Sequence, residues 1–155
     1  MRRKDREVTD LSRMLEVLQA CDCCRLGLVD GDEAYIVPMN FGFTQEDGKL
    51  VLYFHTAREG RKIDLLKKQT SVSFQADTGH GLKPGEHAGN FSFYYQCVMG
   101  KGQAQLLSDN EEKITGFKAI MAHYTGKADW DFDIPCLDRV YVIKLTVIDW
   151  SCKVH

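Results

Sequence analysis

The chain opens with a helical repeat of apolar positions. These positions follow the i, i+3, i+4, i+7 spacing of one helix face and are Leu11, Met14, Leu15 and Leu18. Thr9 or Asp10 can accept hydrogen bonds from the amides of the first turn. The pattern therefore predicts a helix from about Asp10 to Ala20.

Beyond residue 24 the apolar positions form short runs separated by turn-forming residues, which is typical of β-strands. The runs predict six mostly antiparallel strands, at about 25–29, 33–43, 49–55, 71–76, 91–107 and 139–148. Pro38 cannot donate to a strand ladder, so we expect an edge or a bulge there. Gly100 and Gly102 predict a bulge in the long fifth strand.

Two further helices are expected, over 58–68 and 109–124, and Asp109 and Gly126 suit the two ends of the second. Residues 77–89 contain four glycines and predict a long loop. Three helices are too few for a doubly wound α/β sheet, whereas a closed or partly closed β-barrel removes exposed strand edges. We therefore expect a mainly β fold, a six-stranded antiparallel barrel with inserted helices, in a single domain over 1–155.

Charge and cysteine usage narrow the setting in which this barrel works. The formal net charge is -2, from 20 basic and 22 acidic side chains, which gives no global reason to expect nucleic acid or an anionic membrane as a partner. The charged start of the chain is not followed by an apolar stretch suited to a signal peptide or a membrane span. We therefore expect a cytoplasmic, reducing location in which the six cysteines stay free thiols. Cys21-x-Cys23-Cys24 is not a zinc-ligand spacing, so no metal site is expected. At least one of Cys23 and Cys24 is instead expected to be buried as a small apolar side chain.

The most informative stretch is LYFHTAREGRKIDLL, residues 52–66. A strand ends at His55, and Gly60, Arg61 and Lys62 then open a helix. Free amides and the helix dipole favour a phosphate group at such a position. Arg61 can make forked hydrogen bonds to phosphate oxygens, and Lys62 adds a point charge. The alternative is that these basic residues form one solvated face of the helix, and the residues alone leave both interpretations open.

Two further features suit a bound ligand. His55 can donate or accept a proton near neutral pH, or it can simply hydrogen-bond a ligand or the backbone. Phe91, Phe93 and Tyr95 alternate with Tyr94 along the start of the fifth strand. These aromatic residues suit either barrel core plus a dimer interface, or a wall that a second subunit places over a ligand.

Three segments carry a resemblance to a known family: YIVPMNFGF, LYFHTAREGRKIDLL and the late HYTGK. They resemble the pyridoxamine 5′-phosphate oxidase-related proteins, and most of all the branch that contains the Nim 5-nitroimidazole reductases. The resemblance runs from about Arg13 to Lys153 and agrees with the order of the expected strands and helices. It implies an FMN-binding split barrel that forms a homodimer, with two flavins in clefts between the subunits and with FAD as the alternative flavin.

The resemblance also implies which residues hold the flavin. By position, Arg61 and Lys62, assisted by Thr56, match the segment that holds the FMN phosphate. Two strand segments would lie beside the flavin ring, namely Pro38, Met39 and Asn40 in one and Tyr53, Phe54 and His55 in the other. His55 matches the histidine proposed as the active-site residue of Nim-type proteins. Tyr94 and Trp150 are candidates to close the cleft.

The function implied is that of an FMN-dependent reductase, in which the cofactor carries the electrons. The donor would be a reduced nicotinamide or another carrier, and the acceptor a small nitroaromatic, 5-nitroimidazole-like, or quinone-like molecule. The chain lacks the extended C-terminal arginine and histidine motif of the true oxidases, so oxidase activity is not expected. A non-catalytic flavin store or redox sensor is the main alternative. A split barrel for another planar cofactor, such as haem or F420, is a third, although Arg61 and Lys62 favour a phosphate-bearing cofactor over haem.

Overall fold

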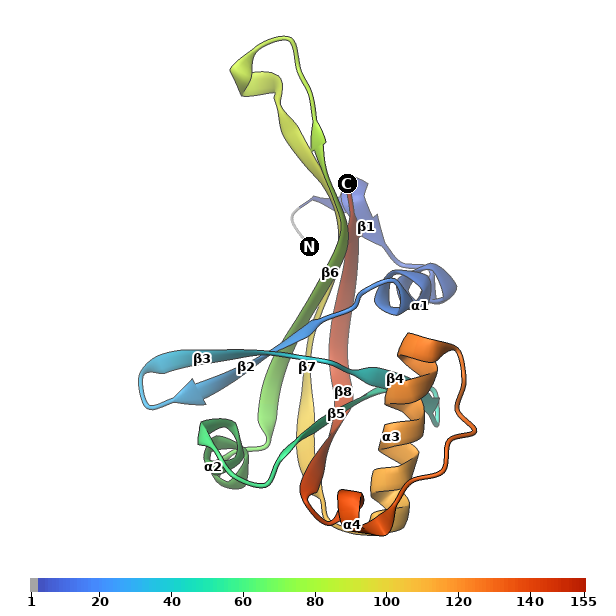
Figure 1. Cartoon of the computed structure of the whole chain (residues 1–155). Helices are drawn as coiled ribbons and strands as arrows, with labels where there is room; N and C mark the ends of the chain where they lie inside the picture. Colours follow the sequence, from blue (N-terminus) through green and yellow to red (C-terminus); the bar gives the residue numbers. More distant parts are fainter. Residues whose placement is uncertain (1–2) are drawn as a thin grey trace.

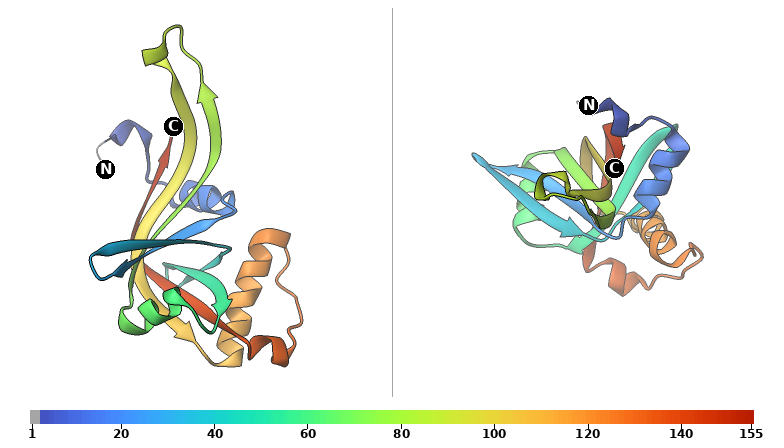
Figure 2. Two further views of the ribbon diagram at one scale, coloured as in Figure 1. Left: turned by 60° about the vertical axis from the view of Figure 1, so that its left-hand side comes forward. Right: turned by 90° about the horizontal axis from the view of Figure 1, so that it is seen from above.

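The computed structural model describes residues 3–155, and its strands form one antiparallel sheet in the order β3-β2-β6-β7-β8-β5-β4, with β1 paired to β8. The strands are β1 (Glu7–Val8), β2 (Cys24–Asp30), β3 (Glu33–Met39), β4 (Gly42–Glu46), β5 (Lys49–Ala57), β6 (Ser71–Lys83), β7 (Ser92–Leu107) and β8 (Val140–Val154). β3 and β4 are consecutive in the chain, yet they form opposite ends of this order. The sheet therefore curls until residues 40 and 41 link its two edges, which makes the partly closed barrel of Figure 1 and Figure 2. The expected mainly β split-barrel fold is confirmed.

Three longer helices pack on this sheet: α1 (Leu11–Gln19), α2 (Arg61–Lys68) and α3 (Asn110–Thr125). Short turns of helix follow residues 3, 87 and 133, as η1 (Lys4–Arg6), η2 (Ala88–Asn90) and α4 (Ile134–Leu137). Apolar side chains of α1 and α2 enter the barrel core, whereas α3 covers the outer side of β4 and β5 (Figure 1). Within residues 3–155, no helix is long and apolar enough to cross a membrane.

β5 is buried on both of its faces. Leu50, Leu52 and Phe54 alternate into the barrel core, while Val51 and Tyr53 lie under α3. The middle of the strand is therefore held between two apolar layers. This arrangement fixes where the side chains at its end must point.

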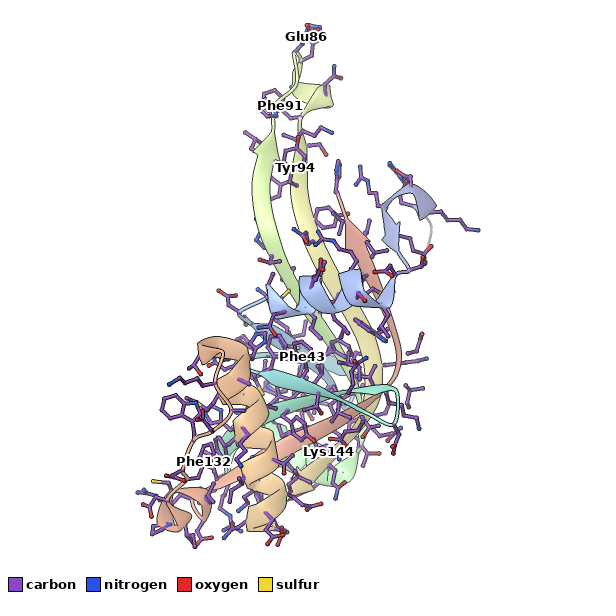
Figure 3. The ribbon with its side chains drawn as sticks, turned by 90° about the vertical axis from the view of Figure 1, so that its right-hand side faces the viewer. Phe43, Glu86, Phe91, Tyr94, Phe132 and Lys144 are labelled. Atoms are coloured by element: carbon purple, nitrogen blue, oxygen red, sulfur yellow. The ribbon has the colours of Figure 1, made fainter. Side chains whose placement is uncertain are left out.

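A hairpin of β6 and β7 projects beyond the barrel. Figure 1 shows both strands running on past the level of α1, and Figure 3 shows Phe91 and Tyr94 along this extension, with Glu86 near its tip. The expected loop at 77–89 is wrong in its first half, because residues 77–83 pair with β7. Backbone pairing needs no side chains, and a register shift between Thr78 and Gly81 accommodates the glycines. The extension also leaves Phe93 exposed, so of the interpretations left open for the aromatic run, a place in the barrel core does not hold.

Several other boundaries differ from the sequence expectations. The predicted strand at 33–43 is divided into β3 and β4 because Phe41 turns fully into the core, and its amide donates to the Tyr124 hydroxyl instead of a strand. Pro38 lies on an edge strand, as expected, because β3 pairs only with β2 among the described residues. The last strand runs on to Val154. The unexpected β1 and the division of 33–43 into β3 and β4 raise the strand number from six to eight.

Other local expectations are confirmed. Asp10 caps α1 by accepting from the Arg13 amide, and Asp109 caps α3, which ends at Gly126 in the left-handed conformation. The long β7 strand shows its register shift between Lys101 and Gly102, where the bulge was expected. Cys24 is fully buried, Cys23 is half-buried, and all six thiols are free.

Close approach of α3 to the barrel depends on two glycines. A Cβ added at Gly42 would lie 2.3 Å from the backbone of Ala119, and one at Gly116 would lie 2.6 Å from Val142. Neither a backbone nor a buried valine can move aside freely in a close-packed interior. The seating of α3 on β4 and β5 thus requires glycine at both positions.

We predict that Gly42→Ala lowers the free energy of unfolding by about 1–3 kcal/mol, the usual cost of overpacking. Gly27→Ala is the matched control, because its added Cβ would meet nothing closer than 3.8 Å. Urea denaturation of both variants measures the difference. Equal stability of the two variants would contradict the proposed backbone contact.

Candidate functional site

The N-terminus of α2 and the end of β5 form the candidate site. Gly60 precedes the helix with φ 119°, a conformation that favours glycine, and the helix begins at Arg61 rather than at Arg58 as expected. The first two amides, those of Arg61 and Lys62, have no acceptor within the helix, whereas those of Ile63 and Asp64 donate to the Gly60 carbonyl oxygen. At the end of β5, Thr56 is only 5% exposed, and its Oγ1 has no hydrogen-bond partner. A buried hydroxyl without a partner is uncommon and indicates a place for a polar ligand group.

The two cations of this segment differ in their surroundings. The Arg61 guanidinium lies 2.6 Å from Asp30 and 3.7 Å from Glu33, and it stacks 4.9 Å from the centre of the Tyr35 ring. Lys62 is half-buried and has no ion pair within residues 3–155. Lys62 is therefore the cation available to an anionic ligand, whereas Arg61 must first leave its carboxylates.

His55 and Thr56 lie on opposite faces of β5, as neighbours in a strand must. The His55 side chain is exposed, and its ring centre lies 5.7 Å from that of Phe117 on α3. Partial burial and the nearby charge of Lys62 lower the pKa of His55 below its ordinary value. The imidazole is consequently neutral at pH 7, so it can either accept or donate a proton.

Sequence reasoning missed Phe117 and the residues that hold Arg61. Phe117 lies on the helix that covers β5, and nothing local in the sequence shows which strand residue that helix face will meet. Asp30 and Glu33 flank a predicted turn, and their reach to Arg61 depends on how the β2–β3 hairpin folds over α2. The only sequence feature that could have suggested this ion pairing is that Asp30 and Glu33 are acidic whereas the start of α2 is basic.

The segment expected beside the flavin ring is part of the free sheet edge. Pro38 and Asn40 are exposed, and Met39 is half-buried against the barrel core. Because β3 pairs with β2 alone among the described residues, its other edge is open to a ligand. This edge presents backbone groups without competing strand hydrogen bonds.

Tyr53 and Phe54 have their side chains inside the protein. Phe54 belongs to the barrel core, and Tyr53 lies under α3, where its hydroxyl donates to Glu46. Lys144, labelled in Figure 3, holds the same carboxylate at 2.8 Å. Both aromatic residues support the strand from within, and only their backbone can lie beside a ligand.

Tyr94 and Trp150 are not brought to this site within one chain. Tyr94 is 43% exposed on the projecting hairpin. Trp150 is half-buried against the core and lies eight positions along β8 from Val142, the residue that pairs with His55. Eight strand residues span roughly 26 Å, so only a second copy of the chain could place either side chain near His55.

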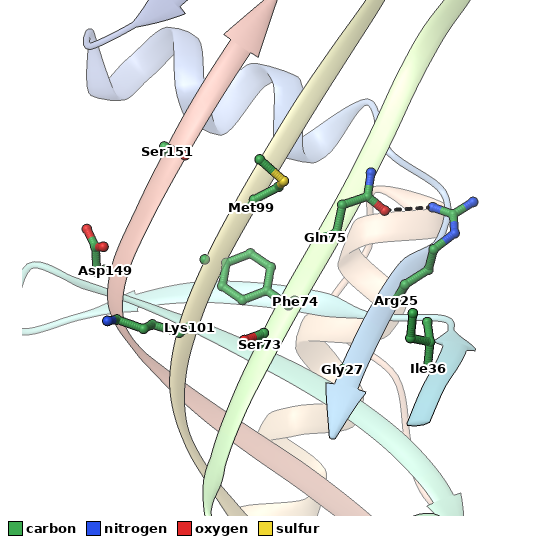
Figure 4. A pocket seen from close by; sticks show the side chains of 11 residues that line it. Arg25, Gly27, Ile36, Ser73, Phe74, Gln75, Met99, Lys101, Asp149 and Ser151 are labelled. Carbon is green, nitrogen blue, oxygen red and sulfur yellow. Dashed lines mark hydrogen bonds between the residues drawn. The ribbon is translucent and has the colours of Figure 1, made fainter. Parts of the chain in front are cut away.

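A hollow of about 630 Å³ lies elsewhere, on the outer face of β2, β6, β7 and β8 (Figure 4). Small residues, Gly27, Ser73 and Gly100, leave this space, and Ile36 and Met99 stand beside it with 64% and 48% of their surface exposed. None of the expected site residues lines it. It is an open depression in a sheet face, and its apolar rim is typical of a surface that another protein covers.

Metal binding finds no support in the arrangement of ligands. Within residues 3–155, no three His, Cys, Asp or Glu side chains are placed to hold a metal ion. His80 is paired with Asp77 at 2.6 Å, and His123 lies in the last turn of α3 with Nε2 bonded to the Cys21 carbonyl oxygen.

A barrel opened at one edge, with a free helix start beside a buried hydroxyl, defines a class of small ligand-binding split barrels. The family model for pyridoxamine 5′-phosphate oxidase matches residues 10–149. The chain therefore belongs to the pyridoxamine 5′-phosphate oxidase family. Among curated protein sequences, none matched significantly.

Solved structures support this assignment. A candidate 5-nitroimidazole antibiotic resistance protein from Bacteroides thetaiotaomicron is 30% identical, with a TM-score of 0.81 over 96% of this chain and 86% of that one. The flavocytochrome Anf3 from Azotobacter vinelandii is 22% identical, with a TM-score of 0.76 over 100% of this chain and 72% of that one. A FAD and heme binding protein from Mycobacterium smegmatis is 17% identical, with a TM-score of 0.81 over 96% and 73%. The last two share the fold.

We predict that Lys62→Gln raises the pKa of His55, because removing a nearby positive charge makes the imidazolium less unfavourable. His55 would then become protonated at a higher pH than in the unaltered protein. An NMR titration of the imidazole protons measures the shift. Lys67→Gln, on the exposed side of the same helix, is the control and leaves this pKa unchanged. No shift in either variant would mean that Lys62 does not act on His55.

Proposed function

We propose that the protein binds FMN and passes its electrons to a small nitroaromatic or quinone-like acceptor. The observation that carries the proposal is the buried Thr56 hydroxyl, which lacks a hydrogen-bond partner and precedes the helix start of α2 by five residues. These groups and the unpaired Lys62 suit a phosphate in charge, hydrogen bonding and position. The nitroimidazole resistance protein that shares 30% identity supports the choice of acceptor.

Each part of the site has a role in holding the cofactor. Lys62 and the first-turn amides would bind the phosphate, with Thr56 donating its hydroxyl proton and Arg61 adding its charge after release from Asp30. The free edge of β3 would offer backbone groups to the flavin ring, and the exposed Asn40 would hydrogen-bond its rim. The phosphate site would also accept FAD. We propose FMN because its single phosphate matches the single unpaired cation at the helix start, Lys62.

Proton delivery falls to His55. A bound, reduced flavin would supply two electrons, and these with two protons would convert a nitro group into a nitroso group and water. His55 is exposed, and its lowered pKa leaves it neutral at pH 7, so it would take up a proton from solvent and pass that proton to the acceptor. Reduced nicotinamide or another soluble carrier would supply the electrons.

A second copy of the chain completes the site in this proposal. The apolar rim of Ile36 and Met99 around the sheet hollow is the face on which the copy would lie. The exposed aromatic residues of the projecting hairpin, including Tyr94, would then reach across the interface. Such a homodimer would bring Tyr94 or Trp150 of one chain over the flavin of the other, in a cytoplasmic, single-domain protein.

We predict that replacing both Arg61 and Lys62 with alanine weakens FMN binding about 10- to 100-fold, from lost charge-assisted hydrogen bonds, and leaves riboflavin binding unchanged. Fluorescence titration of the two flavins measures this, and Lys67→Ala with Lys68→Ala is the control with the same charge change. The FMN-loaded protein should sediment as a dimer. Equal weakening of both flavins would remove the phosphate assignment, and no flavin binding by the unaltered protein would overturn the function.

We predict that His55→Ala and His55→Gln retain FMN but slow its oxidation by a nitroimidazole about 10²- to 10⁴-fold, the usual value of acid–base assistance. Glutamine keeps a hydrogen bond but cannot exchange a proton near neutral pH. The measurement starts from chemically reduced flavoprotein in an anaerobic stopped-flow instrument, with His87→Gln in the hairpin loop as the control. Unaltered rates in both His55 variants would show that His55 is a spectator.

A further inference from the structure

A row of aromatic rings extends away from His55 on the α3 side of β5. The His55 ring lies 5.7 Å from Phe117, and Phe117 lies 5.5 Å from Phe132, with the planes of each pair inclined by 40° and 33°. Phe132 belongs to the segment between α3 and α4, and Figure 3 shows it beside α3, far from the projecting hairpin. Phe117 and Phe132 are both half-buried, so each keeps part of its ring surface available.

The same segment holds an exposed indole. Trp130 is 41% exposed, and its Nε1 donates to the Lys127 carbonyl oxygen at 3.0 Å. That hydrogen bond restrains the ring while its faces stay uncovered. An indole kept in this way can stack on a planar partner at little cost in side-chain entropy.

The segment that holds Trp130 and Phe132 is negative on balance, because Lys127 is set against Asp129, Asp131 and Asp133. Asp129 and Asp131 flank Trp130, are exposed, and form no ion pair within residues 3–155. Lys62, which likewise forms no ion pair within these residues, lies near His55 at the start of α2. Anions are therefore attracted to the phosphate end of the site and repelled from the aromatic end.

We propose that Phe132 and Trp130 form the acceptor subsite of the protein and that Asp129 and Asp131 restrict it to neutral or cationic planar aromatic molecules. The inference rests on the proposed function, in which His55 lies beside the flavin. The acceptor lies over the open part of the Phe117 ring, between Phe132 and the imidazole that delivers the proton. An acceptor with a carboxylate substituent meets the two aspartates and binds poorly. Phe132, Trp130 and the two aspartates determine specificity, and none of them is required for holding the flavin.

The first test separates aromatic stacking from flavin chemistry. Phe132→Leu raises the KM for para-nitrobenzyl alcohol about threefold to tenfold, the usual value of an aromatic pair, with a smaller change in kcat. Oxidation of the reduced flavoprotein by dioxygen, which needs no aromatic surface, keeps its rate. Leu11→Ala, at an exposed apolar position on α1 away from the site, is the control. An unchanged KM in Phe132→Leu overturns the acceptor subsite.

The second test addresses charge. The unaltered protein reduces para-nitrobenzyl alcohol with a higher kcat/KM than para-nitrobenzoate, and Asp129→Asn or Asp131→Asn narrows that difference about twofold to fivefold. Asp47→Asn, in the remote β4–β5 turn, removes the same charge without effect. If neither aspartate variant changes the preference for para-nitrobenzyl alcohol over para-nitrobenzoate, the charge restriction is overturned. If the protein bound no flavin, dioxygen oxidation would be absent in every variant, and the proposed function itself would fail instead.

Discussion

The burial of β5 on both faces is the constraint on which the rest of the site depends. Its alternate residues enter the barrel core or lie under α3, and the glycines at 42 and 116 allow α3 to pack at backbone distance. A strand held this firmly cannot rotate or slip by one residue without exposing an entire apolar set. His55 and Thr56, at its end, are consequently directed to opposite sides with little freedom. The His55 side faces Phe117 of the aromatic row, and Thr56 is buried on the opposite side.

Charge distribution then divides the site into two ends. Arg61 is engaged by Asp30 and Glu33, which leaves Lys62 as the unpaired cation at the helix start. The same lysine, together with partial burial, keeps His55 neutral. A phosphate-bearing ligand would bring negative charge near Lys62 and would favour protonation of the histidine. Ligand binding and proton supply are coupled through a single side chain in this arrangement.

Two exposed surfaces of the chain support the proposed homodimer. A two-stranded ribbon with Phe91, Phe93 and Tyr94 uncovered is poorly stabilised by its own contacts. The sheet hollow with its exposed Ile36 and Met99 is likewise an unusual surface for a monomer. Both features lie outside the candidate site of their own chain. Assembly would therefore bury apolar surface and complete the flavin cleft in one step.

The sequence by itself determined the class of fold, the cap of α1, the cap and end of α3, the edge position of Pro38 and the bulge near Gly102, because each depends on local pattern or backbone chemistry. It also determined that a basic helix start follows a strand ending near His55. Only the tertiary structure decided that 33–43 splits between opposite sheet edges, that 77–83 joins a projecting hairpin, and that Asp30 engages Arg61. It alone brought Phe117 and Phe132 to His55. These outcomes depend on contacts between residues distant in the chain, and no local pattern records which distant partner a side chain will meet.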